Sequence, residues 1–405
     1  MRDRVLEGVL VVDLGRVVSG PMCGQMLADL GAHILKIEPP EGDGGRFSPP
    51  YNNGESGYYM AVNRNKRGIV FDLQTDEAKE FLWEFVKKAD VLVENYRPGV
   101  MDKLGFSYEE VKKVNPKIVY ASVSAYGQYG AYKKLPGFDP LGQAAGGLAA
   151  TSGEPGGAPM KTGAFASDTI GGLTCAAGLL AALIKAKKTG VGAHVDVSLT
   201  DSVVSTLSTY HHSYFAGGKI PEQAGNYDAD SGCVGTYKCK DGYIAIDAGT
   251  DEEWAALAGA IGKPGLYPAK ADRAANAEEI AGLIGAWMAD KEADAAVKEL
   301  REGNVPCTKV LNIEDQLNDE HIAGARGMFP DYYHERTGKI KATANPIKYS
   351  ESPTDIRKPA PIYGEDTEAV LKEWFDLSDE RIKELREMFT PAVLLPEDKP
   401  ELAVY

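Results

Sequence analysis

The 405-residue sequence contains little cysteine or histidine, and neither residue type forms a recognisable binding pattern. The five cysteines are scattered and odd in number, and no CxxC pair occurs, which argues against a disulfide framework or a structural zinc site. The six histidines include no HExxH motif, and the adjacent His211 and His212 would point about 100° apart on a helix. We predict that no metal is bound.

Several other signatures are also missing. The sequence has no GxGxxG, no GxxxxGK[ST] and no GxSxG motif, which argues against a standard dinucleotide site, a P-loop and a serine hydrolase. No run reaches about 18 uninterrupted apolar residues, and the N-terminal MRDRVLEGVLVVDLG is too weakly apolar for a signal peptide. The net charge of −15 argues against nucleic acid or an anionic membrane as a partner. We expect a cytoplasmic protein.

What is present is the pattern of a globular α/β protein. Hydrophobic residues make up 43% and charged residues 25% of the chain, and its length favours two domains. The first half alternates short apolar runs with amphipathic segments, which predicts a mostly parallel sheet flanked by helices. The expected strands are 8–15, 32–40, 68–74, 90–96, 117–127 and 193–199, and the expected helices are 20–31, 76–89, 107–116 and 163–190.

The texture changes near residue 220. Residues 234–249 read as a hairpin that turns at Lys240-Asp241-Gly242, and short helices and one further strand follow. This region predicts a smaller α+β domain. The expected elements are helices 251–261, 275–289 and 291–302, strand 304–312, strands within 325–350 and two helices within 367–388.

Basic residues gather just before the third expected strand and again after the fourth. They are Arg64, Lys66, Arg67, Arg97 and Lys103. Two interpretations stay open at this point. The residues form a solvated loop face, or they form a pocket for phosphate groups in which guanidinium groups and backbone amides act as donors.

One carboxylate stands at the start of the expected helix 163–190. Asp168 precedes about twenty small or apolar residues that end in lysines and Gly190, which is a plausible helix stop. Aspartate is a favoured N-cap, and that role alone would account for the residue. Alternatively, the helix dipole and terminal amides hold this carboxylate ionised in an apolar setting, where it acts as a nucleophile.

Eight segments together resemble the family III CoA-transferases, the group that includes the formyl-CoA:oxalate and carnitine CoA-transferases. They occur in the family's order and span nearly the whole chain. The segments are 19–43, 63–73, 90–106, 136–147, 163–172, 189–199, 305–312 and 359–366.

The resemblance implies a fold and an assembly. The family's large Rossmann-like domain is built from both chain ends and is accompanied by a smaller α+β domain, and two subunits form an interlocked, ring-like homodimer. For this chain we expect residues 1–205 and 325–405 in the large domain, and residues 206–324 in the linker and small domain.

The resemblance also implies site residues. The family's nucleophilic aspartate lies in the motif matched by GAFASD, which places it at Asp168. The implied contacts to coenzyme A are Val17, Lys66, Arg67, Asn95 and Lys103. The substrates would be an acyl-CoA and a small carboxylic acid, and CoA would move through covalent aspartyl intermediates, so neither a metal nor a permanently bound cofactor is expected.

Two departures from the family pattern bear on the substrate. Val18 stands where the formyl-CoA enzyme has a polar residue, and the long glycine loop is reduced to 228–235, which contains Ser231 and Gly232. Phe138 and Asp139 complete the expected substrate pocket. These features favour a less polar acid than oxalate, and we expect a 2-hydroxy acid or a carnitine-type acid. The aromatic segment 210–215 could line an acyl pocket or pack at a dimer interface.

The main alternative is an isomerase. The α-methylacyl-CoA racemases share the fold and exchange a proton through a histidine at the position of Phe138, and phenylalanine cannot exchange a proton. A non-catalytic CoA-binding protein would be expected to lack the nucleophile, yet Asp168 is present. An oxidoreductase would need the missing glycine fingerprint.

Overall fold

The computed structural model describes residues 3–228 and 233–389. The chain divides into two compact units. Unit 1 comprises Met1–Leu148, Thr162–Thr209 and Arg326–Tyr405, and unit 2 comprises Ala149–Lys161 and Tyr210–Ala325. This division follows contacts within the chain, and the domain boundaries expected from the sequence stay a prediction.

Unit 1 is built on a six-stranded parallel sheet, as the alternating pattern predicts. The strand order is β5-β2-β1-β6-β7-β8. The strands are short apolar runs covered on both faces, which is typical of parallel sheets. Their bounds are β1 (Leu10–Asp13), β2 (His33–Glu38), β5 (Lys66–Val70), β6 (Val91–Glu94), β7 (Val119–Ser124) and β8 (Ala193–Ser198).

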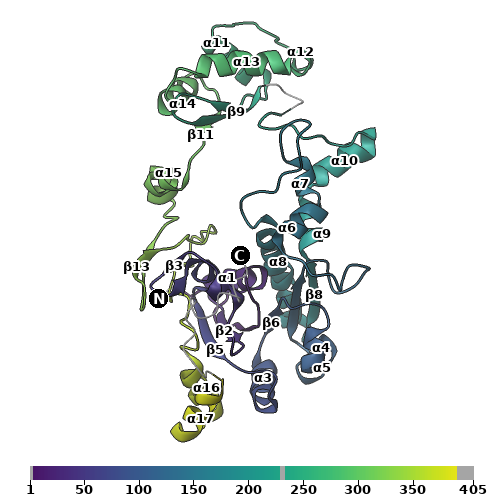
Figure 1. Cartoon of the computed structure of the whole chain (residues 1–405), viewed down its shortest axis with the longest axis vertical. Helices are drawn as coiled ribbons and strands as arrows, with labels where there is room; N and C mark the ends of the chain where they lie inside the picture. Colours follow the sequence, from purple (N-terminus) through teal and green to yellow (C-terminus); the bar gives the residue numbers. More distant parts are fainter. Residues whose placement is uncertain (1–2, 229–232, 390–405) are drawn as a thin grey trace. The chain divides into compact units, whose positions relative to one another are not determined.

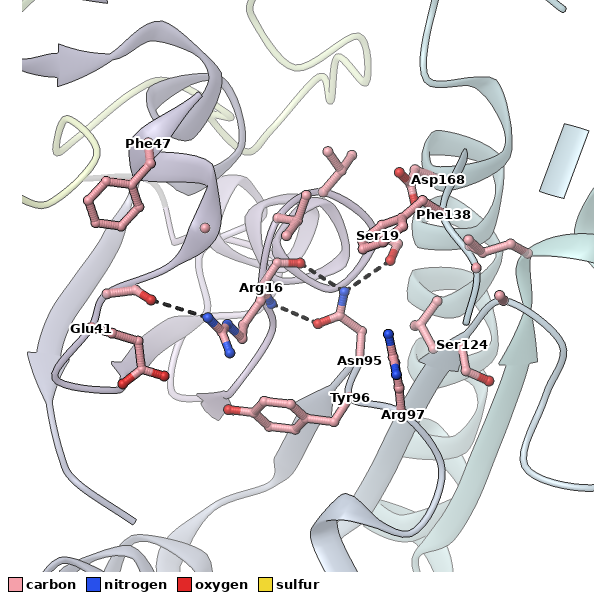
Figure 2. A pocket seen from close by; sticks show the side chains of 18 residues that line it. Arg16, Ser19, Glu41, Phe47, Asn95, Tyr96, Arg97, Ser124, Phe138 and Asp168 are labelled. Atoms are coloured by element: carbon pink, nitrogen blue, oxygen red, sulfur yellow. Dashed lines mark hydrogen bonds between the residues drawn. The ribbon is translucent and has the colours of Figure 1, made fainter. Parts of the chain in front are cut away.

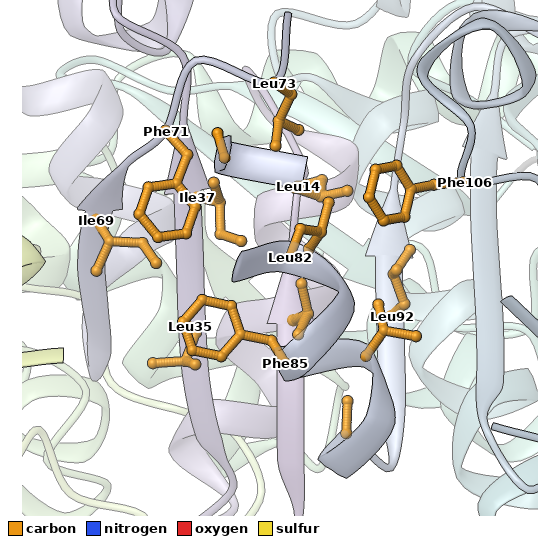
Figure 3. Packing of buried hydrophobic residues seen from close by; sticks show 14 of the residues in the cluster. Leu14, Leu35, Ile37, Ile69, Phe71, Leu73, Leu82, Phe85, Leu92 and Phe106 are labelled. Carbon is orange, nitrogen blue, oxygen red and sulfur yellow. The ribbon is translucent and has the colours of Figure 1, made fainter. Parts of the chain in front are cut away.

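Helices cover the two faces of this sheet (Figure 1). Helices α1 (Ser19–Asp29) and α8 (Ala166–Thr189) pack on one face. Helices α3 (Asp76–Lys88) and α5 (Tyr108–Val114) pack on the other, together with α16 (Thr367–Phe375) and α17 (Asp379–Phe389) near the end of the described chain. Figure 3 shows this second core, in which Phe71 stacks against Phe85 at a centroid distance of 6.0 Å.

The strand order reverses between β1 and β6. From β1 the chain continues to β2 and β5 on one side, and then returns to β6, β7 and β8 on the other. In doubly wound sheets such a reversal opens a crevice at the carboxyl ends of the strands, and ligands bind there. The loops after β1 and β6 therefore meet at this point.

Helix α8 follows the sequence prediction closely. It ends at Gly190, which adopts a left-handed conformation with φ 71°. Gly172 lets α1 approach, because an added Cβ would lie 2.8 Å from the carbonyl oxygen of Ser19. Among the described residues α8 is also the one helix long and apolar enough to cross a membrane, a test that core helices pass as well. Its buried stripe packs into the sheet core.

Unit 2 contains a three-stranded antiparallel sheet of order β11-β10-β9, covered by helices that share one core. The predicted hairpin is confirmed, because its strands are separated by residues 239–242. The elements are β9 (Val234–Lys238), β10 (Tyr243–Asp247), β11 (Cys307–Lys309), α11 (Asp251–Ala260), α13 (Ala277–Met288) and α14 (Ala293–Glu302).

Candidate active site

A cavity of about 300 Å³ lies at the carboxyl ends of β1, β6 and β7, where the strand order reverses. Figure 2 shows its lining side chains, which come mainly from the loops after β1, β2 and β6, the end of β7, the segment before α6 (Asp139–Ala145) and the first turn of α8. The residues that matter below are Arg16, Val17, Val18, Ser19, Asn95, Arg97, Phe138 and Asp168.

The loop after β1 is held in a strained conformation. Val17 has a φ of 67°, which is unusual for a β-branched residue and costs about 1–3 kcal/mol. Asn95 fixes the preceding residue: its Oδ1 accepts from the Arg16 amide at 2.7 Å, and its Nδ2 donates to the Arg16 carbonyl at 2.8 Å. The same Nδ2 donates to Ser19 Oγ at 3.2 Å (Figure 2). Val17 and Asn95, both predicted from the sequence, therefore lie in one cavity.

Buried charge pairs support this loop from below. Asp13 Oδ1 accepts from the Gly15 amide at 2.7 Å, and Asp13 Oδ2 lies 2.8 Å from Lys66 Nζ. Lys36 Nζ donates to the Gly15 carbonyl at 2.7 Å and pairs with Asp43 at 2.8 Å. The Val17 amide donates to Asp43 Oδ1 at 2.9 Å. These buried bonds together hold the backbone of Val17 in its strained conformation.

The surroundings shift the pKa of several of these groups, and two of the shifts are large. Burial opposes ionisation of Asp43, but Lys36 and the amides of Gly45 and Val17 lower its pKa to about 2. Burial lowers the pKa of Lys66 to about 8, and the charge of Asp13 offsets this effect in part. A supporting carboxylate that stays ionised across the physiological range keeps its hydrogen bonds to the loop.

Asp168 points into the cavity from the first turn of α8, and only 5% of its surface is exposed (Figure 2). The N-cap of α8 is Phe165, so the interpretation of Asp168 as an N-cap is wrong. Burial and the nearby charge of Asp139 raise the pKa of Asp168 to about 7, and a hydrogen bond with Ser19 opposes this shift. The carboxylate is therefore less readily ionised than the sequence-based hypothesis assumed, because these two effects outweigh the helix terminus.

Asp139 lies behind the cavity and is 2% exposed. Its Oδ1 accepts from the Ser167 amide at 2.8 Å, from Ser167 Oγ at 3.1 Å and from the Asp168 amide at 3.3 Å. Asp139 therefore supplies the capping carboxylate of α8 from outside the helix. All of these contacts are internal, and the residue does not line the cavity as expected for a substrate contact.

The structure does not gather the five basic residues into one patch. Arg64 pairs with Asp29 at 2.6 Å, Lys66 pairs with Asp13, and Arg67 pairs with Glu373 at 2.7 Å. Lys66 is fully buried because β5 begins at this residue, two positions before the expected strand. Lys103 lies exposed on α4 (Val100–Leu104), outside the cavity lining. The cations that do line the cavity are Arg16 and Arg97.

The remaining predicted residues have mixed placements. Val18 and Phe138 line the cavity, and Phe138 is 47% exposed. Ser231 and Gly232 lie outside the described residues. The aromatic segment 210–215 lies in α10 (Ser208–Gly217), where Phe215 is 73% exposed.

Sequence reasoning missed Arg16 and Ser19, although both flank predicted residues. Ser19 could have been predicted, because it directly precedes the expected helix 20–31, a position where a serine hydroxyl commonly forms a hydrogen bond. Arg16 carried no signal of its own. Among the described residues, no group of three or more histidines, cysteines or carboxylates could hold a metal ion.

Comparison with known proteins agrees with the resemblance. The sequence profile of CoA-transferase family III matches residues 6–367. The acetyl-CoA:oxalate CoA-transferase of Acetobacter aceti is 35% identical over 376 residues, which cover 91% of this chain and 95% of that protein. The succinate–glutarate CoA-transferase of Agrobacterium fabrum is 32% identical, with 92% and 96% covered.

Solved structures show the same relationship. A CAIB/BAIF family protein from Brucella suis superposes with a TM-score of 0.83 at 31% identity, over 92% of this chain and 100% of that one. The protein Rv3272 from Mycobacterium tuberculosis superposes with a TM-score of 0.80 at 26% identity, over 90% and 99%. The resemblance seen in the sequence is thereby confirmed, and the chain belongs to CoA-transferase family III, a family of CoA-transferring enzymes.

Proposed function

We propose that this enzyme moves CoA from an acyl-CoA thioester to a free carboxylic acid through covalent intermediates on Asp168. The observation that carries the proposal is that Asp168 is a buried carboxylate that lines the cavity where the strand order reverses. A carboxylate is a weak nucleophile in water, and desolvation together with positioning raises its reactivity.

The reaction begins when ionised Asp168 attacks the thioester carbonyl of the donor. The C–S bond breaks, CoA leaves as its thiolate, and a mixed anhydride remains on the aspartate. The thiolate then attacks the aspartyl carbonyl and releases the first acid, which leaves an aspartyl-CoA thioester. The acceptor carboxylate attacks this thioester to form a new anhydride, and CoA returns to the acceptor's acyl carbon and frees Asp168.

The transition states carry negative charge on the carbonyl oxygen. Helix α1 begins at Ser19, which lines the cavity, so the positive end of its dipole would lie near the reacting groups. The hydroxyl of Ser19 also hydrogen-bonds with Asp168. Asn95 Nδ2 donates to Ser19 Oγ and so holds this hydroxyl in place before the substrate arrives.

The proposed CoA contacts follow from the placement of the loops. Val17 and Asn95 would face the thioester end of CoA, and Arg16 and Arg97 would meet anionic groups of the substrates. Lys103 and Arg67 are exposed or partly exposed cations and stay proposed contacts to the CoA phosphates. Lys66 is buried, and its proposed role is indirect, through Asp13 and the loop after β1.

The acid that accepts CoA is proposed to be a dicarboxylic acid, and a 2-hydroxy dicarboxylic acid is included in this class. Relatives are named for oxalate, glutarate and L-malate. The guanidinium groups of Arg16 and Arg97 suit a second carboxylate. The same charges would repel the cationic end of a carnitine-type acid, which makes that acid the weaker candidate. A panel of acids tested with succinyl-CoA would distinguish them.

The homodimer is a further part of the proposal. Apolar side chains of α6, α8 and α9 (Leu199–Thr206) are exposed in the isolated chain, and burying them in a second copy would stabilise an interlocked pair. These residues are Leu141, Leu173, Ile184 and Val204, which are 47%, 42%, 58% and 39% exposed. Light scattering after size-exclusion chromatography should give twice the chain mass, and a monomer at micromolar concentration would contradict the assembly.

Trapping the intermediate tests the function directly. The protein is mixed with succinyl-CoA, its intact mass is measured, and hydroxylamine is added before peptide mapping. We expect a CoA-bearing adduct that becomes a hydroxamate at Asp168. The Asp168→Asn variant should form none, and Asp201→Asn, which alters the exposed first-turn aspartate of α9, should behave as the unaltered protein. No adduct with any thioester, together with exchange of α-protons in deuterated solvent, would favour the racemase alternative.

A further inference from the structure

Two buried aspartates meet at the start of α8, and the proposed function uses only one of them. We propose that Asp139 is a positioning residue that fixes the first turn of α8 and keeps a second negative charge beside Asp168, so that acylation of Asp168 relieves the repulsion between them. This inference rests on the proposed function, because it explains how the Asp168 carboxylate is kept reactive as the nucleophile.

The positioning part follows from the contacts of Asp139. Four bonds converge on its carboxylate, three of them from the Ser167 amide, the Ser167 hydroxyl and the Asp168 amide. The Ser167 hydroxyl also reaches the Asp139 carbonyl at 2.9 Å. The backbone that carries the nucleophile is therefore tied to the first residue of α6, and it cannot shift without breaking buried bonds.

Gln143 extends this support to the segment that leads into α8. Its Nε2 donates to Asp139 Oδ2 at 2.7 Å and to the Ala164 carbonyl at 3.2 Å, while its Oε1 accepts from the Thr162 amide at 2.9 Å. Gln143 is fully buried. One amide side chain thus joins the segment before α8 to the carboxylate that caps the helix, and it orients that carboxylate toward Asp168.

The electrostatic part follows from the imbalance of donors. Asp139 receives four hydrogen bonds, whereas the hydrogen bond that opposes the shift at Asp168 is the one with Ser19. Among the described residues neither carboxylate has a cation within ion-pairing distance. Repulsion between buried like charges disfavours ionisation of the less well supported group. This agrees with the pKa of Asp168, which burial and Asp139 raise to about 7.

Other charged groups surround α8, but burial, Asp139 and Ser19 set the pKa of Asp168. The elements packed against α8 and the cavity wall contribute the following further groups: Asp29 on α1, Asp201 on α9, His194 and Asp196 on β8, and Arg16, Glu41 and Arg97 around the cavity.

Covalent chemistry removes the repulsion. When an Asp168 oxygen bonds to the acyl carbon, the electron pair of the C–S bond leaves with the CoA thiolate, and the aspartate becomes a neutral acyl group. The negative charge moves from beside Asp139 to the departing sulfur. The free enzyme is thus raised in free energy relative to the acylated enzyme, which favours the intermediate, and the more basic carboxylate is also the better nucleophile.

The test removes the charge and keeps the acceptor. In Asp139→Asn, Oδ1 can still accept from the Ser167 and Asp168 amides. The protonation of Asp168 is followed by infrared spectroscopy as a carboxyl band, identified by its absence in Asp168→Asn. We expect its midpoint to fall by roughly one pH unit or more, and the acid limb of kcat/KM to move down by the same amount. The trapped fraction of CoA adduct should fall roughly tenfold per unit.

A second variant separates charge from hydrogen bonding. In the double variant Asp139→Asn with Gln143→Glu, the new carboxylate can accept from the asparagine amide and from the Thr162 amide, so the negative charge moves from position 139 to position 143. Only the bond from Gln143 Nε2 to the Ala164 carbonyl is lost. The titration midpoint of Asp168 in this double variant should lie between that of the unaltered protein and that of Asp139→Asn. Asp201→Asn should not move it.

An unchanged midpoint in a folded Asp139→Asn protein would overturn the inference even if transfer activity is normal. If the unaltered enzyme forms no adduct and transfers no CoA, the proposed function fails instead, while the infrared titration still measures the coupling of the two aspartates.

Discussion

Four buried aspartates around the cavity form two groups with opposite electrostatic surroundings. Below the loop after β1, Asp13 and Asp43 are each paired with a buried lysine at 2.8 Å. At the start of α8, Asp139 and Asp168 lie close to each other, and neither has an ion pair within the part of the chain that the structure describes. All four aspartates are nearly inaccessible to solvent.

The difference shows that neighbouring charges decide whether burial prevails in setting the pKa of these carboxylates. Burial alone raises the pKa of both Asp43 and Asp168. Lys36 and backbone amides reverse this effect and bring the pKa of Asp43 to about 2. Asp139 instead adds to the effect of burial, and the pKa of Asp168 rises to about 7. The ion pairs of Asp13 and Asp43 stabilise the strained loop after β1. Two neighbouring carboxylates, Asp139 and Asp168, instead give Asp168 a perturbed pKa, which is typical of a reactive group.

The largest effect is expected from breaking a neutralised pair. Lys66→Met leaves the Asp13 carboxylate buried without its cation, and this should lower the free energy of unfolding by about 3–5 kcal/mol. Urea unfolding followed by circular dichroism measures the loss. The double variant with Asp13→Asn should recover part of it, because no unpaired charge remains. A weaker affinity for CoA with unchanged stability would instead support direct phosphate contact by Lys66.

The opposite sign is expected at the unbalanced pair. An acid with a raised pKa in the folded state destabilises the protein increasingly as pH rises from the unfolded value, about 4, toward the folded value. Asp168→Asn removes this cost, so the variant should be more stable by about 2–4 kcal/mol at pH 8, and the gain should vanish toward about pH 4. Urea unfolding at several pH values measures it. A pH-independent difference would mean that Asp168 is not coupled to its surroundings in this way.

An intermediate effect is expected where the two regions meet. Asn95 bonds to Arg16 on the loop and to Ser19, the partner of Asp168. Asn95→Ala removes three hydrogen bonds, and we expect a loss of about 1–3 kcal/mol in stability and a higher KM for the acyl-CoA. Asn95→Asp retains the acceptor for the Arg16 amide and should recover part of the stability. A change in kcat with unchanged KM would indicate that Asn95 acts through Ser19 alone.

Much of the frame was predictable from the sequence. The alternation of apolar runs and amphipathic segments places the six sheet strands and helices α1, α3, α5 and α8 within a few residues, because short buried strands and capped helices have strong local signals. The short helices α4, α6 and α9 were not predicted. Parallel strands bring their following loops to one edge, which is why Val17 and Asn95, almost eighty residues apart, meet in the cavity.

The supporting charges were not predictable. Lys66 and Asp13 are 53 residues apart, and only the register of β1, β2 and β5 brings them together. A lysine in a basic segment normally indicates an exposed loop, and the sequence gives no sign that β5 begins two residues early. Asp139 lies 29 residues from Asp168 and carries the signature of an ordinary helix start. Tertiary packing, and not a local signal, assigns both roles.

The smallest effect is expected at Arg67, which follows Lys66 directly in the sequence. Its ion pair with Glu373 lies at the surface, where the partner is 58% exposed, and such pairs contribute about 0–1 kcal/mol. Arg67→Ala should therefore leave stability within about 1 kcal/mol of the unaltered protein, in contrast to Lys66→Met. If Arg67 binds a CoA phosphate, as the family resemblance implies, the KM for acyl-CoA should rise several-fold and become less sensitive to salt, with kcat unchanged. An unchanged KM would remove Arg67 from the substrate site and leave Arg16 and Arg97 as the cations to test. If the KM does rise, two neighbouring residues divide the roles that one basic segment indicated, because the Lys66 side chain is buried against Asp13 and the Arg67 side chain is partly exposed to solvent.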